Sequence, residues 1–192
     1  KSSLSRKAMG YEVGASPLQM VSALSTIVND GVRYESRIVD AIFDERGLVV
    51  EARKPKIVNE STISPGTASA MRKALVKVCL PGGTGMQAVP PGYTCGGKTG
   101  TSQKFDPKRG GYKAGHYVVS FMGFVPAENP KFIGIVVVDD PRVSKVKLYG
   151  GSVAAPVFRR IAERAMDYLK VEPTEPTSQE LANSTHQNVP AY

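Results

Sequence analysis

The sequence predicts an α/β domain of the α+β type, in which helices flank an antiparallel β-sheet. Three segments have the capping residues and apolar spacing of helices, and two consecutive segments between residues 116 and 141 are rich in β-branched and aromatic residues. No strand–helix–strand crossover can be read from the order of the elements, which favours antiparallel strands. The 192 residues suffice for one domain with its own core, and no run of 18 apolar residues would span a membrane.

Helices are predicted over residues 16–30, 64–80 and 153–169. In the first two, a serine stands at the N-cap position and a proline follows at the first helical position, where its missing N–H costs nothing. Apolar residues recur in all three segments at the spacing of one helix face. In the last helix, the side that we expect to pack carries Val157, Ile161, Ala165 and Tyr168.

Strands are predicted at residues 116–126 and 131–141, which the turn "AENP" would join into an antiparallel hairpin. Two shorter β-prone runs around "DERG", within residues 36–52, predict a second hairpin. Residues 172–192 are polar, contain prolines and are typical of a disordered tail. The folded domain is therefore expected to cover residues 1–171.

The composition bears on which ligands the chain can bind. Its net charge is +8, but the basic residues are scattered and no helix gathers them into a stripe. Nucleic-acid binding is not predicted, since an anionic surface or substrate accounts for the charge equally well. Cys79 and Cys95 are too few for a zinc site, and they are either two buried thiols or one disulfide. No metal or organic cofactor is predicted.

The stretch "GYTCGGKTGTSQK", residues 92–104, fits two motifs that require different surroundings. The first is G-x-x-x-x-G-K-[ST], which binds nucleotide phosphates when a buried strand precedes it and a helix begins straight after it. Here Pro90 and Pro91 stand before the match, and several glycines and a proline follow Thr99. Because neither the strand nor the helix can form, nucleotide binding is not predicted.

The second motif is K-T-G, here Lys98-Thr99-Gly100, which occurs in enzymes that acylate a serine with β-lactams. On an edge strand, Lys98 and the hydroxyls of Thr99 and Thr101 would face a cleft and bind a carboxylate. A backbone N–H beside Gly100 would be placed to donate to an oxyanion. These four residues alone fit an ordinary strand with a solvated lysine at least as well, so the rest of the chain has to decide.

Six segments of the chain together decide between an active-site motif and an ordinary strand. They are "GYEVGASPLQM", "LPGGTGMQAV", "GYTCGGKTGTSQK", "GGYKAGHYVVSFMGFVPAENPKF", "IGIVVVDDP" and "YGGSVAAPVFRRI". In this order and with these gaps, from about residue 10 to residue 171, the chain resembles the class B penicillin-binding proteins. These are the monofunctional D,D-transpeptidases of peptidoglycan synthesis, and the division and elongation types resemble it most. The resemblance implies the penicillin-binding, serine β-lactamase-like transpeptidase fold, with this chain as its C-terminal half.

The resemblance also implies a role for each residue of the motif. Lys98 would position the hydroxyl of a catalytic serine and help proton transfer. Thr99 and Thr101 would hold the terminal carboxylate of a D-Ala-D-Ala stem peptide or of a penicillin, and the N–H of Thr101 would form half of the oxyanion hole. Residues 104–118 would be a loop that borders the cleft. The other substrate-binding residues of the strand would be Gly100, Ser102 and Gln103.

Two further motifs of the family, S-x-x-K and S-x-N, should precede K-T-G. The one S-x-x-K match, Ser144 to Lys147, comes after it and in a predicted turn, and no asparagine has a serine two places before it. We therefore expect the nucleophile outside this chain, on a missing upstream segment or a second chain, and expect this chain alone to be inactive. The strand at 131–141 would then lack a partner, so the fragment would be poorly stable or aggregate.

The partners that the resemblance implies are stem peptides as substrates, β-lactams as inhibitors, the N-terminal half of the domain and other proteins of cell-wall synthesis. It implies a bacterial inner-membrane anchor upstream and a domain facing the periplasm or extracytoplasmic space, in cell division or cell-shape maintenance. The alternatives are a truncated or degenerate fragment that only binds, and a serine β-lactamase or D,D-carboxypeptidase. The segments at 10–20 and 149–158 are typical of the transpeptidases and favour that function.

Overall fold

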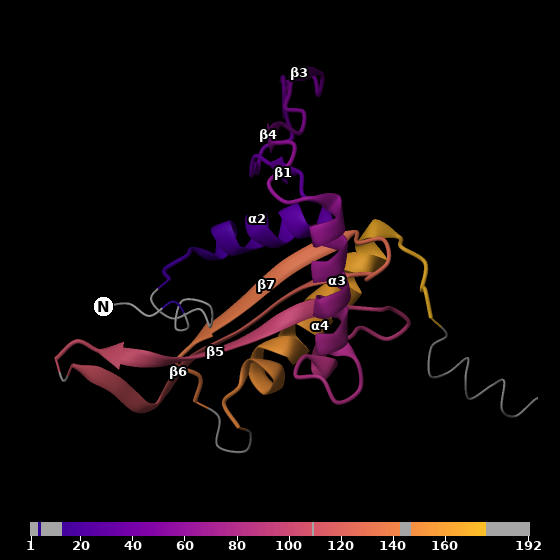
Figure 1. Cartoon of the computed structure of the whole chain (residues 1–192). Coiled ribbons are helices and arrows are strands. Elements are labelled where there is room, and N and C mark those ends of the chain that lie inside the picture. The colour runs from indigo at the N-terminus through magenta and orange to yellow at the C-terminus, as the bar shows by residue number, and fades with distance from the viewer. Residues whose placement is uncertain (1–3, 5–12, 109, 143–146, 176–192) are drawn as a thin grey trace, which may run out of the picture.

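The computed structural model describes residues 4, 13–108, 110–142 and 147–175 of the chain. Its body has three layers, with helices on both faces of a three-stranded sheet (Figure 1). The helices and strands that follow one another in the chain are α2 (Pro17–Val28), β1 (Arg33–Tyr34), β2 (Ala41–Phe43), β3 (Val49–Ala52), β4 (Ile57–Asn59), α3 (Pro65–Cys79), the 3₁₀ turn η1 (Met86–Ala88), β5 (Gly96–Asp106), β6 (Gly111–Val125), β7 (Phe132–Asp139) and α4 (Gly150–Leu169).

The predicted N-caps of the first two helices are confirmed. The Ser16 hydroxyl accepts a hydrogen bond from the N–H of Gln19, and the Gln19 side chain accepts one from the N–H of Ser16, which together make a capping box. The Ser64 hydroxyl accepts from the N–H of Thr67 at the start of α3. Proline is the first residue of both helices, as the sequence indicates.

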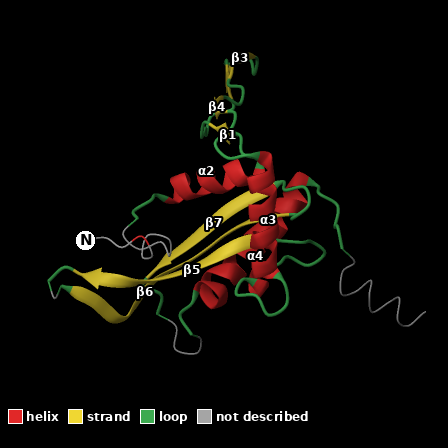
Figure 2. Ribbon diagram, in the orientation of Figure 1, coloured by secondary structure: helices red, strands yellow, loops and turns green. Residues whose placement is uncertain are grey.

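The antiparallel sheet is also confirmed, with strands in the order β5-β6-β7. β5 and β6 are longer than predicted, and the segment 104–118 is not a loop. β5 continues to Asp106 and β6 begins at Gly111, so the two strands extend as a hairpin past Asp139, where β7 ends (Figure 2). The pairing shifts register between Gln103 and Phe105, an irregularity of the kind that bends a strand and increases its twist.

The two faces of the sheet have separate cores. On one face α4 covers Phe121 and Val125 of β6, and Phe158 of α4 packs edge-to-face on Phe121 with ring centroids 4.9 Å apart. On the other face α2 and α3 contribute Leu24 and Leu75, which pack on Phe124. The alternation of side chains along β6 therefore divides its residues between the two cores.

The packed side of α4 differs from the predicted one. Val157, Ile161 and Tyr168 are exposed, and only Ala165 of the predicted set packs against the core. The buried residues of the helix are Gly150, Ala154, Ala155, Phe158, Ala162 and Met166. Small residues at four of these positions let the helix axis approach the sheet, and the sequence pattern of larger apolar residues on the opposite side was misleading for that reason.

The hairpin predicted within residues 36–52 is confirmed as β2 and β3, but it stands away from the sheet. Together with the β1–β4 pair it forms an arm, residues 33–59, that projects from the body beyond α2 and α3 (Figure 1). All of its strand residues except Ala41 are exposed. In the described part of the chain, no helix is long and apolar enough to cross a membrane.

Candidate active site

The K-T-G residues lie on β5, which is an edge strand as predicted because it pairs only with β6 among the described strands. Lys98, Thr99 and Gly100 stand opposite Met122, Phe121 and Ser120. Before the motif, a Cβ on Gly97 would lie 2.5 Å from the Phe121 ring, and one on Gly96 would lie 2.3 Å from the Phe124 ring. The two glycines therefore leave room for the rings of Phe121 and Phe124, which a larger residue at either position would displace.

Successive side chains of β5 point to opposite faces of the sheet, and this separates Lys98 from the threonines. Thr99 pairs with the core residue Phe121 and faces α4, as does Thr101. Lys98 pairs with Met122, which belongs to the core on the α2 and α3 side. The three side chains therefore do not line one cavity among the described residues, and their common cleft stays a prediction.

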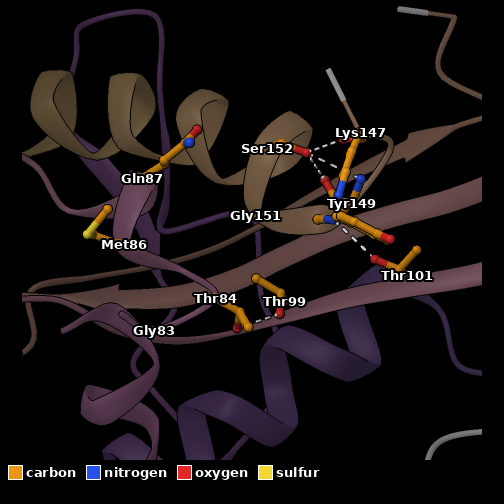
Figure 3. Close-up of a pocket in the computed structure, with 11 residues that line it drawn as sticks. Gly83, Thr84, Met86, Gln87, Thr99, Thr101, Lys147, Tyr149, Gly151 and Ser152 are labelled. Carbon is orange, nitrogen blue, oxygen red and sulfur yellow. Dashed lines mark hydrogen bonds between the residues drawn. The ribbon is translucent and has the colours of Figure 1, made fainter. Parts of the chain in front are cut away.

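Thr99 and Thr101 line a cavity of about 500 Å³ between β5, the first turn of α4 and the segment around η1 (Figure 3). The Thr99 hydroxyl is 3.0 Å from the hydroxyl of Thr84, and the Thr101 hydroxyl accepts a hydrogen bond of 3.2 Å from the N–H of Gly150. The remaining residues that line the cavity are Gly83, Met86, Gln87, Lys147, Tyr149, Gly151 and Ser152.

The first turn of α4 approaches β5 closely because it begins with two glycines. A Cβ on Gly150 would lie 2.2 Å from the Ser120 carbonyl oxygen, and one on Gly151 would lie 2.1 Å from that of Thr84. Backbone atoms occupy both places, so neither glycine can be enlarged without moving the helix. The first turn of the helix, Gly150 to Ser152, lines the cavity, and the positive end of the helix dipole there favours a bound anion.

Lys98 lies outside this cavity, and its side chain is exposed. Its ammonium group donates a hydrogen bond of 2.6 Å to the carbonyl oxygen of Thr99. This contact holds the ammonium against the strand, near the backbone that joins the two threonines. The charge is thus available to a group that approaches β5 from the α2 and α3 side or along its open edge.

Of the other predicted substrate-binding residues, Gly100 lies between the two threonines, and Ser102 and Gln103 follow farther along the strand. A Cβ on Gly100 would lie 2.4 Å from the Ser120 hydroxyl, so a larger residue here would have to displace the Ser120 side chain. Ser102 is exposed, and the amide of Gln103 donates to the Lys113 carbonyl in the extended hairpin. Neither Ser102 nor Gln103 lines the cavity. The other sequence candidate, Ser144, lies outside the described residues.

Apart from Lys147, which was named only in the S-x-x-K match, the residues that complete the cavity were not singled out from the sequence. They come from two segments, residues 83–87 and 147–152, that are about 60 positions apart and meet beside β5. A signal for both was present, because "LPGGTGMQAV" and "YGGSVAAPVFRRI" carry part of the family resemblance. Nothing in either segment alone indicated that Thr84 would reach Thr99.

A charged cluster lies just past the end of β7, beside β6, and none of its residues lines the cavity. The Asp140 carboxylate lies 2.8 Å from Nδ1 of His116 and accepts a hydrogen bond of 2.8 Å from Arg142. The hydrogen bond with His116 and the charge of Arg142 hold the pKa of Asp140 below its usual range. Among the described residues, no group of three or more His, Cys, Asp or Glu side chains could hold a metal ion.

Comparison with known proteins gives one matching family model, the penicillin binding protein transpeptidase domain, over residues 1–163. The chain is 37% identical over 166 residues to stage V sporulation protein D of Bacillus subtilis, covering 86% of this chain and 25% of that protein. It is 30% identical over 164 residues to the peptidoglycan D,D-transpeptidase FtsI of Buchnera aphidicola, covering 85% of this chain and 27% of that protein. The chain thus spans about a quarter of the length of these relatives.

Solved structures show the same similarity in three dimensions. The transpeptidase domain of penicillin-binding protein 3 from Burkholderia pseudomallei superposes with a TM-score of 0.70 at 31% identity, covering 86% of this chain and 46% of that one. Penicillin-binding protein 3 from Mycobacterium tuberculosis, complexed with ampicillin, gives a TM-score of 0.71 at 33% identity, covering 88% of this chain and 38% of that one. Both the mixed helix and antiparallel-sheet fold and the assignment to the C-terminal part of such a domain are confirmed.

Proposed function

Since the chain belongs to the penicillin-binding protein transpeptidase domain family, we propose that it forms the K-T-G wall of a peptidoglycan D,D-transpeptidase active site. In the complete enzyme, a serine outside this chain attacks the carbonyl carbon of the D-Ala-D-Ala bond, D-alanine leaves, and the acyl group passes to an amine of a second stem peptide. The observation that carries the proposal is the pair of threonine hydroxyls, Thr99 and Thr101, on an open edge strand beside the N-terminus of α4.

The threonine face of β5 has the chemistry to bind the terminal carboxylate of the donor peptide or of a β-lactam. Two hydroxyls can donate hydrogen bonds, Lys147 adds positive charge, and the N-terminus of the 20-residue helix α4 favours an anion. Thr84 supports this role, because its hydroxyl bond restricts the rotation of the Thr99 hydroxyl. No metal or cofactor takes part in the proposed reaction.

Lys98 would serve the nucleophile from the other face of the same strand. Its ammonium can hold a serine hydroxyl of the upstream half and help move the proton during acylation. The Thr99 carbonyl that accepts from Lys98 is directed away from β6, since it bonds to that side chain at 2.6 Å. Backbone groups two residues apart point to the same edge of a strand, so the Thr101 N–H would also face the open edge, where an oxyanion donor is needed.

The wider setting belongs to the same proposal. The upstream half of the domain would cover Lys98, carry the serine and a membrane anchor, and place the site outside the inner membrane. Stem peptides would be the substrates and β-lactams the inhibitors, and other proteins of cell-wall synthesis would be partners. Residues 1–171 would form the folded part, while 172–192 would be a tail; of these, Thr174 and Glu175 donate their N–H groups to the Gly92 carbonyl.

Fluorescent penicillin tests the proposal directly. The longest natural product containing this chain should be labelled, its Lys98→Ala variant should lose label by about 10²–10⁴-fold in rate, and the 192-residue chain should not be labelled. Lys104→Ala is the matched control, because Lys104 lies on the same face of β5 but pairs with Asp139 at 2.7 Å. Label on the 192-residue chain alone would place the nucleophile within it, and absence of label on both would favour a protein that only binds.

A further inference from the structure

Two buried sulfur atoms meet next to the proposed site, and the mechanism above uses neither. The Sγ atoms of Cys79 and Cys95 are 3.5 Å apart, with the two residues only 4% and 3% exposed. Cys79 is the last residue of α3, and Cys95 directly precedes β5. Both belong to the core beneath α4, among Ala88, Tyr93 and Phe121.

We propose that Cys79 and Cys95 form a disulfide that fastens the end of α3 to the start of β5. The two sulfurs are 3.5 Å apart as free thiols and have to approach to the bond length of about 2.05 Å. A metal site does not explain the pair, since no third ligand-type side chain joins it among the described residues. The oxidising compartment that the inference needs rests on the extracytoplasmic location in the proposed function.

The cross-link forms by two thiol–disulfide exchanges with an external disulfide, carried by a small molecule or an oxidoreductase protein. One of the two cysteines, for example Cys79, first loses its proton. Its thiolate attacks the external disulfide and releases one thiolate; Cys95, after losing its proton, attacks the mixed disulfide and releases the second. Two thiols are oxidised and one disulfide is reduced to two thiols. Because both sulfurs are buried in the folded chain, the exchange takes place during folding.

The position of the bond gives it a consequence for the active site. The segment that it closes, residues 80–94, contains Thr84, whose hydroxyl contacts Thr99, and Met86 and Gln87 of the cavity wall. This segment is rich in glycine and proline and has the single turn η1 as its regular structure. Tying its two ends together reduces the number of conformations that it can adopt. The cross-link would thus hold one wall of the carboxylate-binding cavity against β5.

Peptide mapping of the full-length protein, prepared from its oxidising compartment, tests the cross-link. After denaturation with an alkylating agent present and proteolysis without reductant, we expect the Cys79 and Cys95 peptides as one linked species. Alkylation of both cysteines in that sample would overturn the inference. The wild-type protein is used, so the result does not depend on whether a variant folds.

A thermal measurement tests whether the bond acts on stability. Reductant should lower the melting temperature of the full-length wild-type protein by about 5 °C or more. It should not change the melting temperature of the full-length Cys79→Ala/Cys95→Ala double variant. An equal response of both proteins would contradict the inference. Fluorescent penicillin labelling reads the proposed function separately. A labelled protein with two free thiols rejects only the cross-link, whereas a linked protein without label keeps the cross-link and rejects the transpeptidase assignment.

Discussion

The two faces of the β5–β6–β7 sheet are covered to different degrees. On the α4 face, one 20-residue helix lies along the sheet and buries Phe121, Val125 and Phe158 almost completely. On the other face, α2 and α3 bury Leu24 and Leu75, but Leu18, Met71 and Lys98 remain exposed. The first face is complete within the described residues, and the second is partly open.

This difference matches the division of the K-T-G motif between the faces. Thr99 and Thr101 are positioned by partners that this chain supplies, namely Thr84 and the first turn of α4. The one described partner of the Lys98 ammonium is the neighbouring Thr99 carbonyl. In the proposed function, the closed face would bind the carboxylate, and the open face would leave Lys98 available to the upstream half that carries the nucleophile.

The largest expected effect on stability comes from Phe158→Ala, which would open a cavity in the closed face. Phe158 packs on both Phe121 and Phe132, so its removal should cost about 3–5 kcal/mol. Tyr168→Ala on the same helix is the matched control, because Tyr168 is exposed and its loss should change stability by about 0.5 kcal/mol or less. Chemical denaturation of the full-length protein measures both, and a larger cost for Tyr168→Ala than for Phe158→Ala would mean that the helix packs as the sequence pattern predicts.

A smaller effect is expected where α4 meets the cavity wall. Gly151→Ala places a methyl group 2.1 Å from the Thr84 carbonyl oxygen, and the required shift should cost about 1–3 kcal/mol. Gly66 is also the second residue of its helix, but a Cβ there has no neighbour closer than 3.9 Å. Gly66→Ala should therefore be neutral or slightly stabilising. If thermal melting shows no difference between the two variants, the close approach of α4 to the strand is wrong.

The smallest effect is expected at Asp140, just past the end of β7. Its folded-state pKa is lowered, so its carboxylate contributes stability above the unfolded pKa of about 3.9, and this contribution is lost as the pH falls through the folded value. Asp140→Asn should lower the melting temperature slightly at pH 7, and the gap from the wild type should close below about pH 4. A gap that stays constant from pH 7 down to about pH 2, through the range in which the carboxylate takes up its proton, would show that the carboxylate charge is not what stabilises this end of β7.

Local signals in the sequence were sufficient for much of the fold. Serine caps followed by proline located α2 and α3, and β-branched runs located β6 and β7, because these features act on neighbouring residues. The packed side of α4 could not be read in the same way. Four of its six buried residues are alanine or glycine, and only the shape of the sheet beneath the helix makes small residues the better fit there.

The candidate site was predicted in its parts but not in its arrangement. The motif gave Lys98, Thr99 and Thr101, whereas their separation onto two faces follows from strand alternation, which a motif does not express. Thr84 and Gly151 reach the site through tertiary packing between distant segments. Ser102 and Gln103 continue the strand away from the cavity, so their assignment to substrate binding stays a prediction.

Acylation kinetics of the full-length protein with a β-lactam test the separate roles of the two faces of β5 most directly. They separate the dissociation constant of the first complex from the rate constant of acylation. Lys98→Ala should lower the rate constant by about 10²–10⁴-fold and leave the dissociation constant nearly unchanged. Thr101→Val should raise the dissociation constant about tenfold or more and affect the rate constant less, since it removes a hydrogen bond to the carboxylate. If both variants change the same constant by similar factors, the two faces of β5 do not have separate roles.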